Sequence, residues 1–486
     1  MLSIIFLVLF LILMIIIGIW GMKKTSTLND FFLGNRSVGP WISAIAYGTT
    51  YFSAVLFIGF AGKLGWGLGL NALWISLGNT LIGSLLAWLI LAKRTRTMTQ
   101  NLNSMTMPEF LEARYHSRLL KIFSAILIFV FLLPYSASVF KGLGHLFEAN
   151  FKINYDIALL IMILITGIYM VLGGYFAITL NDFIQGIIMI IGAILMVIIL
   201  VGKAGGLTES VSTIIKEYNN HIPIEKQPNF LTILCFVLMT SFGPWGLPQM
   251  VQKFYAIKNE SVIKKAAIIT TIFAFIVVFS AYWTGAMTHI FYTPSSLPLT
   301  ENGTVNYDAL IPNLLKNNLP DFLMAIILLL ILSASMSTLS SLVLVSSSSV
   351  AIDLYKGHIN PNISKKNSLA MMRFLSAIFI VISYFIARFK IGIIVTLMSL
   401  SWGAVAGSLM APYIYGLFWK RVTKEGAFAG MITGLLLSVS LFFIMGEKNS
   451  SISSVIAMAF PFIVVPVVSL LTKPPKKEII DIAFKE

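Results

Sequence analysis

The sequence predicts an all-α protein that crosses a membrane about thirteen times, with a core of two five-helix halves related by inversion. Three observations lead to this fold class. Of the 486 residues, 58% are hydrophobic and 11% are charged, which is too apolar for a soluble domain. Most of the chain divides into apolar stretches of about 20 residues, the length that crosses a bilayer as a helix. Two of these stretches carry helix-breaking residues near their middle.

Thirteen apolar stretches can be placed along the chain. We expect the spans to begin near residues 2, 41, 67, 120, 155, 182, 230, 266, 322, 368, 391, 426 and 451. Residues 1–472 then form one membrane domain with core repeats at about 41–202 and 230–418, and residues 473–486 form a short cytoplasmic tail. Lys23 and Lys24 follow the first stretch, which has no small-residue cleavage site, so we interpret it as a retained span.

The net charge of +15 arises in short connections between spans. Most of the 34 lysines and arginines fall on one side of the membrane, which is typical of cytoplasmic loops, so the charge does not indicate nucleic-acid binding. With an odd number of spans, the N-terminus is expected outside and the C-terminus inside a plasma membrane. No obligate protein partner is predicted beyond the lipid bilayer. The single cysteine, Cys235, excludes an intrachain disulfide.

The two interrupted spans are the second and the seventh. Residues 48–53 read GTTYFS, a glycine with several hydroxyl side chains, although threonine and serine can also bond back to their own helix. Residues 243–248 read GPWGLP, and two prolines with two glycines cannot continue a regular helix. The interruptions lie five spans apart. Because five is odd, the second half would enter the membrane from the opposite side, as in secondary transporters built from inverted repeats.

The ninth span carries a stripe of hydroxyl groups. Residues 332–349 read LSASMSTLSSLVLVSSSS, and helical spacing places Ser333, Ser337 and Ser341 on one face beside Thr338. One interpretation is that small hydroxyl residues let neighbouring helices pack closely. The other is that Ser337 and Thr338 bind a dehydrated monovalent cation, together with carbonyl groups that are freed where the second span unwinds.

The acidic residues favour sodium over protons as the coupling ion. Proton coupling usually needs an intramembrane carboxylate or histidine, and none stands beside either interruption. We expect the acids to lie at span ends or in loops. Typical examples are Asp30, Glu109, Asp182, Asp321, Asp353 and Glu425. Aromatic rings of Tyr51, Tyr135 and Trp245 could surround a small solute, although packing alone would explain each of them.

Four motifs in order carry a resemblance to a known family. They are NDFFLGNRSVGP at 29–40, the pair Gly173-Gly174 followed by Asp182 and Gln185, SMSTLSS at 335–341 running to DLYK at 353–356, and WKRVTKEGAFAG at 419–430. With these motifs the chain resembles the sodium/solute symporter family over essentially its whole length, and most of all its sodium/proline symporter branch. The resemblance implies thirteen spans, the five-plus-five inverted-repeat fold and sodium-driven solute uptake.

The resemblance also implies site residues. For sodium, it points to backbone oxygens of Thr49, Phe52 and Ala334 and to the hydroxyls of Ser337 and Thr338. For the solute, the candidates are Tyr51, Ser53, Ala54, Tyr135, Trp245 and Pro248. For gating and coupling, they are Arg36 and Asp182. Tyr51 departs from the proline transporters, which have an aspartate there, and the motif around Trp245 keeps only Pro248 in register.

We therefore expect a sodium-coupled symporter that imports a small organic solute. An amino acid such as proline is the first expectation, and a monocarboxylate or pantothenate-like acid is the alternative. An enzyme is disfavoured because the five histidines are scattered and only His289 lies at a span edge. A channel is disfavoured because no charged ring or carbonyl-filter repeat occurs. A membrane receptor that binds its solute without translocating it is the remaining alternative from a different class.

Overall fold

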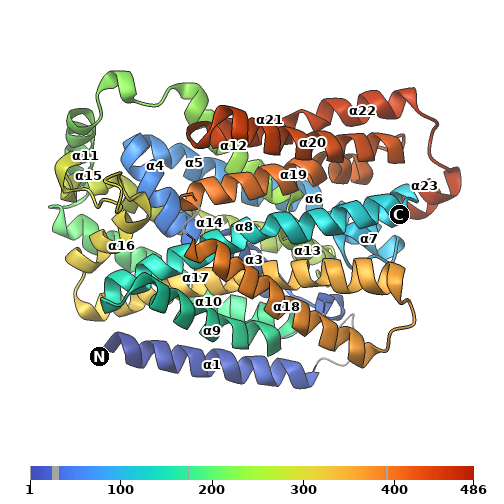
Figure 1. The fold of residues 1–486 in the computed structure, drawn as a ribbon, viewed down its shortest axis with the longest axis horizontal. Helices are drawn as coiled ribbons and strands as arrows, with labels where there is room; N and C mark the ends of the chain where they lie inside the picture. The colour runs from blue at the N-terminus through green and yellow to red at the C-terminus, as the bar shows by residue number, and fades with distance from the viewer. Residues whose placement is uncertain (1, 25–31, 173–174, 390–391, 486) are drawn as a thin grey trace.

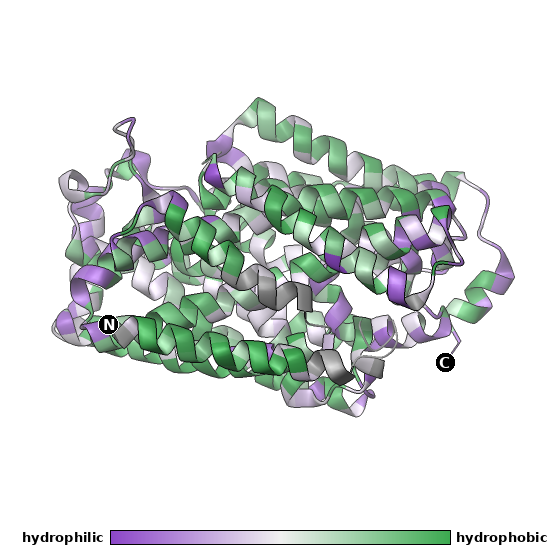
Figure 2. Cartoon of the chain, turned by 60° about the horizontal axis from the view of Figure 1, so that its bottom comes forward, coloured by the Kyte–Doolittle hydropathy of each residue, from purple (hydrophilic) through white to green (hydrophobic). Residues whose placement is uncertain are grey.

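The fold is a single bundle of helices. The computed structural model describes residues 2–24, 32–172, 175–389 and 392–485, and regular structure there consists of helices and two isolated β-bridges. The pair Gly173-Gly174 and residues 29–31 of the first motif lie outside the described residues. Long helices pack side by side, with α1 at one edge and α20 and α22 at the opposite edge (Figure 1). Hydrophobic residues cover the middle of the bundle and hydrophilic residues gather at its two ends, as expected in a membrane (Figure 2).

The helices follow the chain as predicted, with short connections. The first half contains α1 (Leu2–Lys24), α3 (Pro40–Tyr51), α4 (Ala61–Leu68), α5 (Leu73–Gly78), α6 (Ala87–Asn101), α7 (Met107–Tyr115), α8 (Arg118–Phe151), α9 (Tyr155–Leu172) and α10 (Tyr175–Lys203). The second half contains α11 (Leu207–His221), α12 (Phe230–Gly246), α13 (Pro248–Tyr255), α14 (Ser261–Ala286), α15 (Thr288–Phe291), α16 (Tyr307–Asn318), α17 (Asp321–Ser348), α18 (Lys365–Arg388) and α19 (Ile394–Phe418). The remaining helices are α20 (Lys424–Met445), α21 (Ser450–Ala459), α22 (Pro461–Leu471) and α23 (Lys477–Ala483).

Eleven helices among the described residues are long and apolar enough to cross a membrane, whereas thirteen spans were expected. The counts differ at two places. The broken second span does not qualify as a unit, since its second part joins the third span in one stretch, Val55–Asn101. The fifth span, α9, qualifies only as a shorter apolar helix, Tyr155–Leu164.

Both predicted helix breaks are present. The helix α3 ends at Tyr51, and Phe52 has extended backbone angles (φ −112°, ψ 119°) before the chain continues in the π-helical segment η2 (Val55–Phe60) and then α4. The helix α12 ends at Gly246, and Leu247 is extended (φ −83°, ψ 122°) because it precedes Pro248, the first residue of α13. Each half of the core therefore opens with a discontinuous helix, as the predicted fold class requires.

The serine-bearing helix lies in the interior. In their apolar windows, 78% of the residues of α17 and 94% of those of α19 are buried, compared with 22% in α1 and in α20. The helix α17 packs against α10, α8 and α3, and α19 packs against α8 and α12. The hydroxyls of α17 therefore face other helices and not lipid.

Two expectations need correction, and one connecting helix is buried. The helix α7 buries Phe110, Leu111 and Arg114, and Arg114 donates hydrogen bonds to the carbonyls of Gly416 and Trp419. The sixth span begins at Tyr175 and not near 182, so Asp182 lies inside α10. The histidines are not all scattered. The rings of His221 and His289 stack, with 3.1 Å between their Nδ1 atoms, because α11 folds back onto α15.

A glycine contact between α4 and α14 provides a test of this packing. A Cβ at Gly65 would overlap the backbone of Gly285, whereas a Cβ at Gly67 would meet nothing within 4 Å. We predict that Gly65→Ala lowers the free energy of unfolding by about 1–3 kcal/mol through overpacking. Gly67→Ala, two residues along the same helix, is the matched control and should unfold at the wild-type temperature. Thermal unfolding of the purified proteins measures both, and equal unfolding temperatures would contradict the contact.

Candidate functional site

The end of α3 and the middle of α17 meet inside the bundle. The Ser337 hydroxyl, which has one proton to donate, lies within hydrogen-bond distance of the carbonyls of Thr49 (2.9 Å) and Ala334 (3.0 Å). The Thr338 hydroxyl lies within the same reach of the carbonyls of Thr50 (3.0 Å), Ala334 (3.1 Å) and Thr49 (3.3 Å). All five residues are fully buried. Four of the five predicted ligand residues are therefore within hydrogen-bond distance of one another.

The backbone explains why these carbonyls are available. The last carbonyl groups of an α-helix have no intrahelical partner, and α3 ends inside the protein where water cannot reach them. Sequence reasoning did not include the Thr50 carbonyl, although its position one residue from the end of α3 was the signal. The Thr50 hydroxyl lies 3.1 Å from that of Ser341, a second link between the helices. Phe52, the fifth predicted ligand, stacks its ring on Tyr51 and donates its backbone N–H to the carbonyl of Gly48.

The oxygen atoms that meet here are the carbonyls of Thr49, Thr50 and Ala334 and the hydroxyls of Ser337 and Thr338, which we call the α3–α17 cluster. All of them are neutral. Carbonyl and hydroxyl oxygens are suitable ligands for hard alkali cations. A hydroxyl can rotate, so Ser337 and Thr338 can turn their lone pairs toward a cation and release the carbonyls to which they now donate. The arrangement can therefore exchange internal hydrogen bonds for ion ligation without moving the backbone far.

A small cavity of about 20 Å³ lies beside the break. Tyr51, Ser53 and Tyr135, three predicted solute-binding residues, line it together. The Tyr51 hydroxyl donates to the carbonyl of Thr240, and the ring of Tyr135 stands edge-on to that of Trp402, with 5.8 Å between centroids. The remaining lining residues are Phe52, Val55, Leu56, Phe60, Asn79, Thr240, Tyr282, Met398 and Trp402. The cavity has room for one or two water molecules, so a solute requires the surrounding helices to separate.

Three other solute candidates lie elsewhere. Trp245 donates its indole N–H to the carbonyl of Ile82 and lines a different, apolar cavity of about 340 Å³. Pro248 lines a third cavity, near α7. Ala54 borders the break, where its N–H donates to the Ser335 hydroxyl. The structure thus separates Trp245 and Pro248 from the cavity beside Tyr51.

Sequence reasoning missed several residues of that cavity, Trp402 above all. They come from helices that are distant in sequence, so spacing along one helix could not group them. The only signal was a tryptophan in the Gly-, Ala- and Ser-rich helix α19, where a bulky ring requires small neighbours. Gly243 of α12 provides one, because a Cβ there would overlap the Trp402 ring.

A buried ion pair lies toward one end of the bundle. The Lys141 ammonium of α8 lies 2.9 Å from the Asp308 carboxylate of α16, and their side chains are 6% and 2% exposed. Lys141 also donates to the carbonyl of Gly392, and Asp308 accepts the backbone N–H of Ile394 at the start of α19. The segment 293–320, which contains α16, therefore contributes a charged group that is buried against α8 and α19.

Another buried ion pair lies at the opposite end, with the predicted gating residues. Asp182 of α10 is 3.1 Å from Lys253 of α13, and both side chains are buried. Arg36 donates to the hydroxyl of Thr99 and to the carbonyls of Tyr255 and Ser104 at 3.0–3.1 Å. Burial lowers the pKa of the Arg36 guanidinium, which nevertheless stays protonated at physiological pH.

The acids were expected at span ends or in loops, but Asp182 lies inside α10, and the burial of acids was not foreseen. Asp182 and Asp353 are 0% exposed. Their polar partners, Lys253 and the Thr106 hydroxyl, come from segments far away in sequence. A pattern along one helix could not reveal these pairings.

Two broken helices, each at the start of one half of the core, are the arrangement found in secondary transporters. The family model described as "Sodium:solute symporter family" matches residues 31–434. The chain therefore belongs to the sodium:solute symporter family.

The similar proteins are transporters. The "High-affinity proline transporter PutP" of Bacillus subtilis (strain 168) is 32% identical over 471 residues, covering 96% of this chain and 98% of the relative. The "Sodium/proline symporter" of Escherichia coli (strain K12) is 29% identical, covering 87% and 84%. Among solved structures, a substrate-bound, outward-open Na⁺-coupled sialic acid symporter superposes with a TM-score of 0.82 at 20% identity, covering 98% of each chain, which shows a common fold.

The Lys141–Asp308 pair yields a prediction about stability. Asp308→Asn should lower the free energy of unfolding by about 3–5 kcal/mol, because it leaves a buried ammonium without its partner charge. The double variant Lys141→Met, Asp308→Leu removes both charges and should recover most of that loss. Thermal unfolding in the same detergent compares the variants. A double variant as unstable as Asp308→Asn would show that lost packing, and not the unpaired charge, is responsible.

Proposed function

We propose that this chain is a sodium-coupled symporter that imports a small, net-neutral amino acid, with proline as the first candidate. The observation that carries the proposal is the contact of the Ser337 and Thr338 hydroxyls with the carbonyls of Thr49 and Ala334 at the break in α3. Membership of the family and relatives named as proline transporters support the same function. The membrane orientation that agrees with the charge bias puts the N-terminus outside and the C-terminus in the cytoplasm.

The cavity beside the break supports a net-neutral solute. None of its twelve lining residues carries a charge at neutral pH, and six of them are aromatic, namely Tyr51, Phe52, Phe60, Tyr135, Tyr282 and Trp402. An anion such as a monocarboxylate would find no partner charge among these residues, and sodium at the neighbouring ion site would be its only counter-charge. A zwitterion carries no net charge, and apolar ring atoms can contact the aromatic walls.

The geometry supports a coupling mechanism. Sodium would replace the hydrogen bonds between α17 and the end of α3, so that ion and helix end are held together. This fixes Tyr51 and Ser53, which follow the ligands directly and line the solute cavity. Ion binding thereby orders the solute site. Separation of Lys141 from Asp308 would open the outer path, and separation of Lys253 from Asp182, with release of the Arg36 contacts, would open the inner one.

Removal of one predicted sodium ligand tests the ion site. We expect Thr338→Ala to raise the half-saturating external sodium concentration for solute uptake at least tenfold, which corresponds to about 1.4 kcal/mol. Uptake into proteoliposomes with an imposed sodium gradient measures this. Ser383→Ala is the control, because the Ser383 hydroxyl is equally buried but bonds only to the carbonyl of Phe379 in its own helix. Undiminished uptake driven by a proton gradient in sodium-free buffer would contradict the proposal.

A thermal-shift screen tests the solute class. Amino acids and small carboxylates are added to the purified protein in sodium or in choline buffer. We expect proline to stabilise the protein only in sodium, by about 2.7 kcal/mol when its concentration is one hundred times its Kd. Trp402→Ala should weaken that stabilisation, because the indole forms part of the cavity wall. Sodium-dependent stabilisation by a monocarboxylate, without any by amino acids, would refute the solute assignment.

A further inference from the structure

Polar side chains continue along α17 beyond the proposed sodium ligands. Residues 346–349 are four consecutive serines, and Asp353 follows in the π-helical segment η7 (Ser349–Ile359). All of them are buried. From the rise of a helix, Asp353 lies roughly 20 Å from Thr338. It lies toward the end of the bundle that holds Arg36, because Thr106, its hydrogen-bond partner, is two residues from Ser104, which accepts from Arg36.

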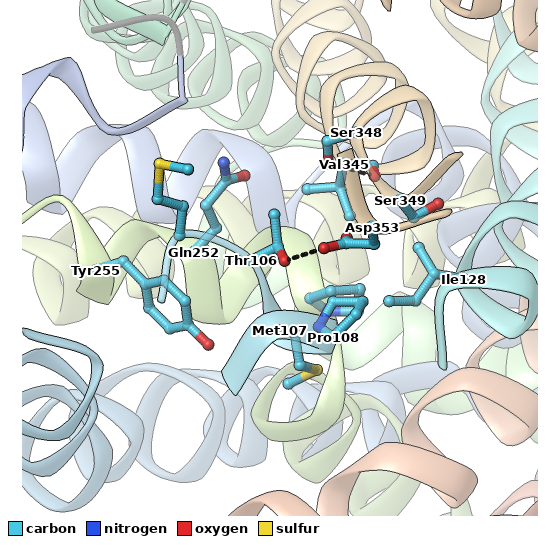
Figure 3. Close-up of a pocket in the computed structure, with 12 residues that line it drawn as sticks. Thr106, Met107, Pro108, Ile128, Gln252, Tyr255, Val345, Ser348, Ser349 and Asp353 are labelled. Atoms are coloured by element: carbon cyan, nitrogen blue, oxygen red, sulfur yellow. Dashed lines mark hydrogen bonds between the residues drawn. The ribbon is translucent and has the colours of Figure 1, made fainter. Parts of the chain in front are cut away.

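Asp353 has a carboxylate that is only half satisfied. Its Oδ1 accepts a hydrogen bond from the Thr106 hydroxyl at 2.7 Å (Figure 3). Its Oδ2 is buried and has no hydrogen-bond partner within the part of the chain that the structure describes. A buried carboxylate oxygen without a partner is costly, so such a group either holds a proton or binds a cation.

The carboxylate borders a small cavity between α7, α8, α13 and the end of α17 (Figure 3). The cavity measures about 10 Å³, the room that one water molecule or one small cation needs. Among its lining residues, Thr106, Gln252, Ser348 and Ser349 carry side-chain oxygens, as does Asp353.

The serine and threonine hydroxyl protons beside the carboxylate are already in use. Ser348 and Ser349 donate to the carbonyls of Val345 and Ser346 in their own helix, and Thr106 donates to Asp353. Each of these three hydroxyls keeps lone pairs that can only accept a hydrogen bond or bind a cation. Such acceptors beside an unpartnered carboxylate oxygen suit a hard cation better than an added hydrogen-bond acceptor.

The surrounding charges also favour a cation. Three charged side chains act on Asp353, namely Glu109, Glu112 and Lys121. Lys121 is bound to Glu112 at 2.8 Å, so this pair leaves Asp353 and Glu109 without a compensating ammonium. The Glu109 carboxylate accepts the backbone N–H of Met105, which holds it at the start of α7.

We propose that Asp353, with Thr106, Ser348 and Ser349, forms an inner cation site that sodium occupies between the α3–α17 cluster and the cytoplasm. The inference rests on the proposed sodium-coupled function. The serines of α17 connect the two sites along one buried helix, and the inner site supplies the full negative charge that the neutral central cluster lacks. A cation released from the centre is thus drawn toward the inner end of the transporter.

Sodium binding to the full-length protein in nanodiscs tests the inner site. Equilibrium binding of ²²Na⁺ is measured for the wild type, Thr338→Ala, Asp353→Asn and the double variant. We expect each single variant to lose about half of the saturable sodium binding and the double variant to lose nearly all of it. Glu425→Gln, which removes an exposed carboxylate at the start of α20, is the charge-matched control and should bind as the wild type does.

Each outcome decides a separate point. Sodium binding that Thr338→Ala abolishes and Asp353→Asn leaves unchanged keeps the proposed function and overturns the inner site. Unchanged sodium binding in Asp353→Asn, combined with a shifted pH dependence of uptake, would identify Asp353 as a proton site and also overturn the inference. Absence of sodium binding in the wild type would overturn the proposed function itself.

Unfolding temperatures show whether Asp353→Asn loses sodium binding or simply fails to fold. In sodium-free buffer, Asp353→Asn should unfold at or above the wild-type temperature, because it removes a buried and unpartnered charge. Addition of sodium should then raise the unfolding temperature of the wild type more than that of Asp353→Asn. An equal sodium-induced shift in both proteins would count against the inner site even if binding could not be resolved into two components.

Discussion

The hydrogen bonds from α17 to the end of α3 are the constraint on which the rest of the structure depends. A helix that stops inside a membrane leaves carbonyl groups that neither water nor lipid can satisfy, and each such group costs about 1–3 kcal/mol. Ser337 and Thr338 supply the missing donors. This requirement fixes the register of α17 against α3 and keeps the hydroxyl stripe in the interior. A cation that binds here must replace the hydrogen-bond donors that those hydroxyls provide to the carbonyl oxygens.

Two buried lysine–aspartate pairs lie at the two ends of the transporter, and each joins one half of the core to the other. The first half contributes Lys141 and Asp182, and the second half contributes Asp308 and Lys253. Loss of a partner from such a pair costs about 3–5 kcal/mol, so separation of both pairs at once would be far more costly than separation of one. This difference in free energy favours states in which at least one end is closed, which is the physical requirement for alternating access.

The sequence predicted the elements well because their signals are local. Glycine with hydroxyl residues marked the first helix break, and glycine with proline marked the second. The hydroxyl stripe on α17 marked the face that meets α3. The chemistry at the ends of the bundle depends on pairs that are distant in sequence, such as Asp182 with Lys253, and no periodicity reports them. The same limit explains why sequence reasoning missed Trp402, which lines the cavity beside Tyr51 through the packing of α12 against α19. It also explains why Trp245 was wrongly grouped with that cavity, because its position near a break did not determine where its side chain points.

The distribution of charge supports the proposed path of the ion. At the centre, α3 and α17 offer dipoles without a formal negative charge, so a dehydrated cation there is held by neutral oxygens only. Buried carboxylates occur instead toward the two ends, where Asp308 is bound to Lys141 and Asp182 to Lys253. Asp353, toward the inner end, is not bound to any ammonium group of the described chain. Because Coulomb attraction strengthens in a low dielectric, an unpaired buried carboxylate attracts a cation more strongly than the same group would in water. A neutral centre and an unpaired carboxylate toward the inner end therefore support the proposal that sodium passes from the centre to an inner site.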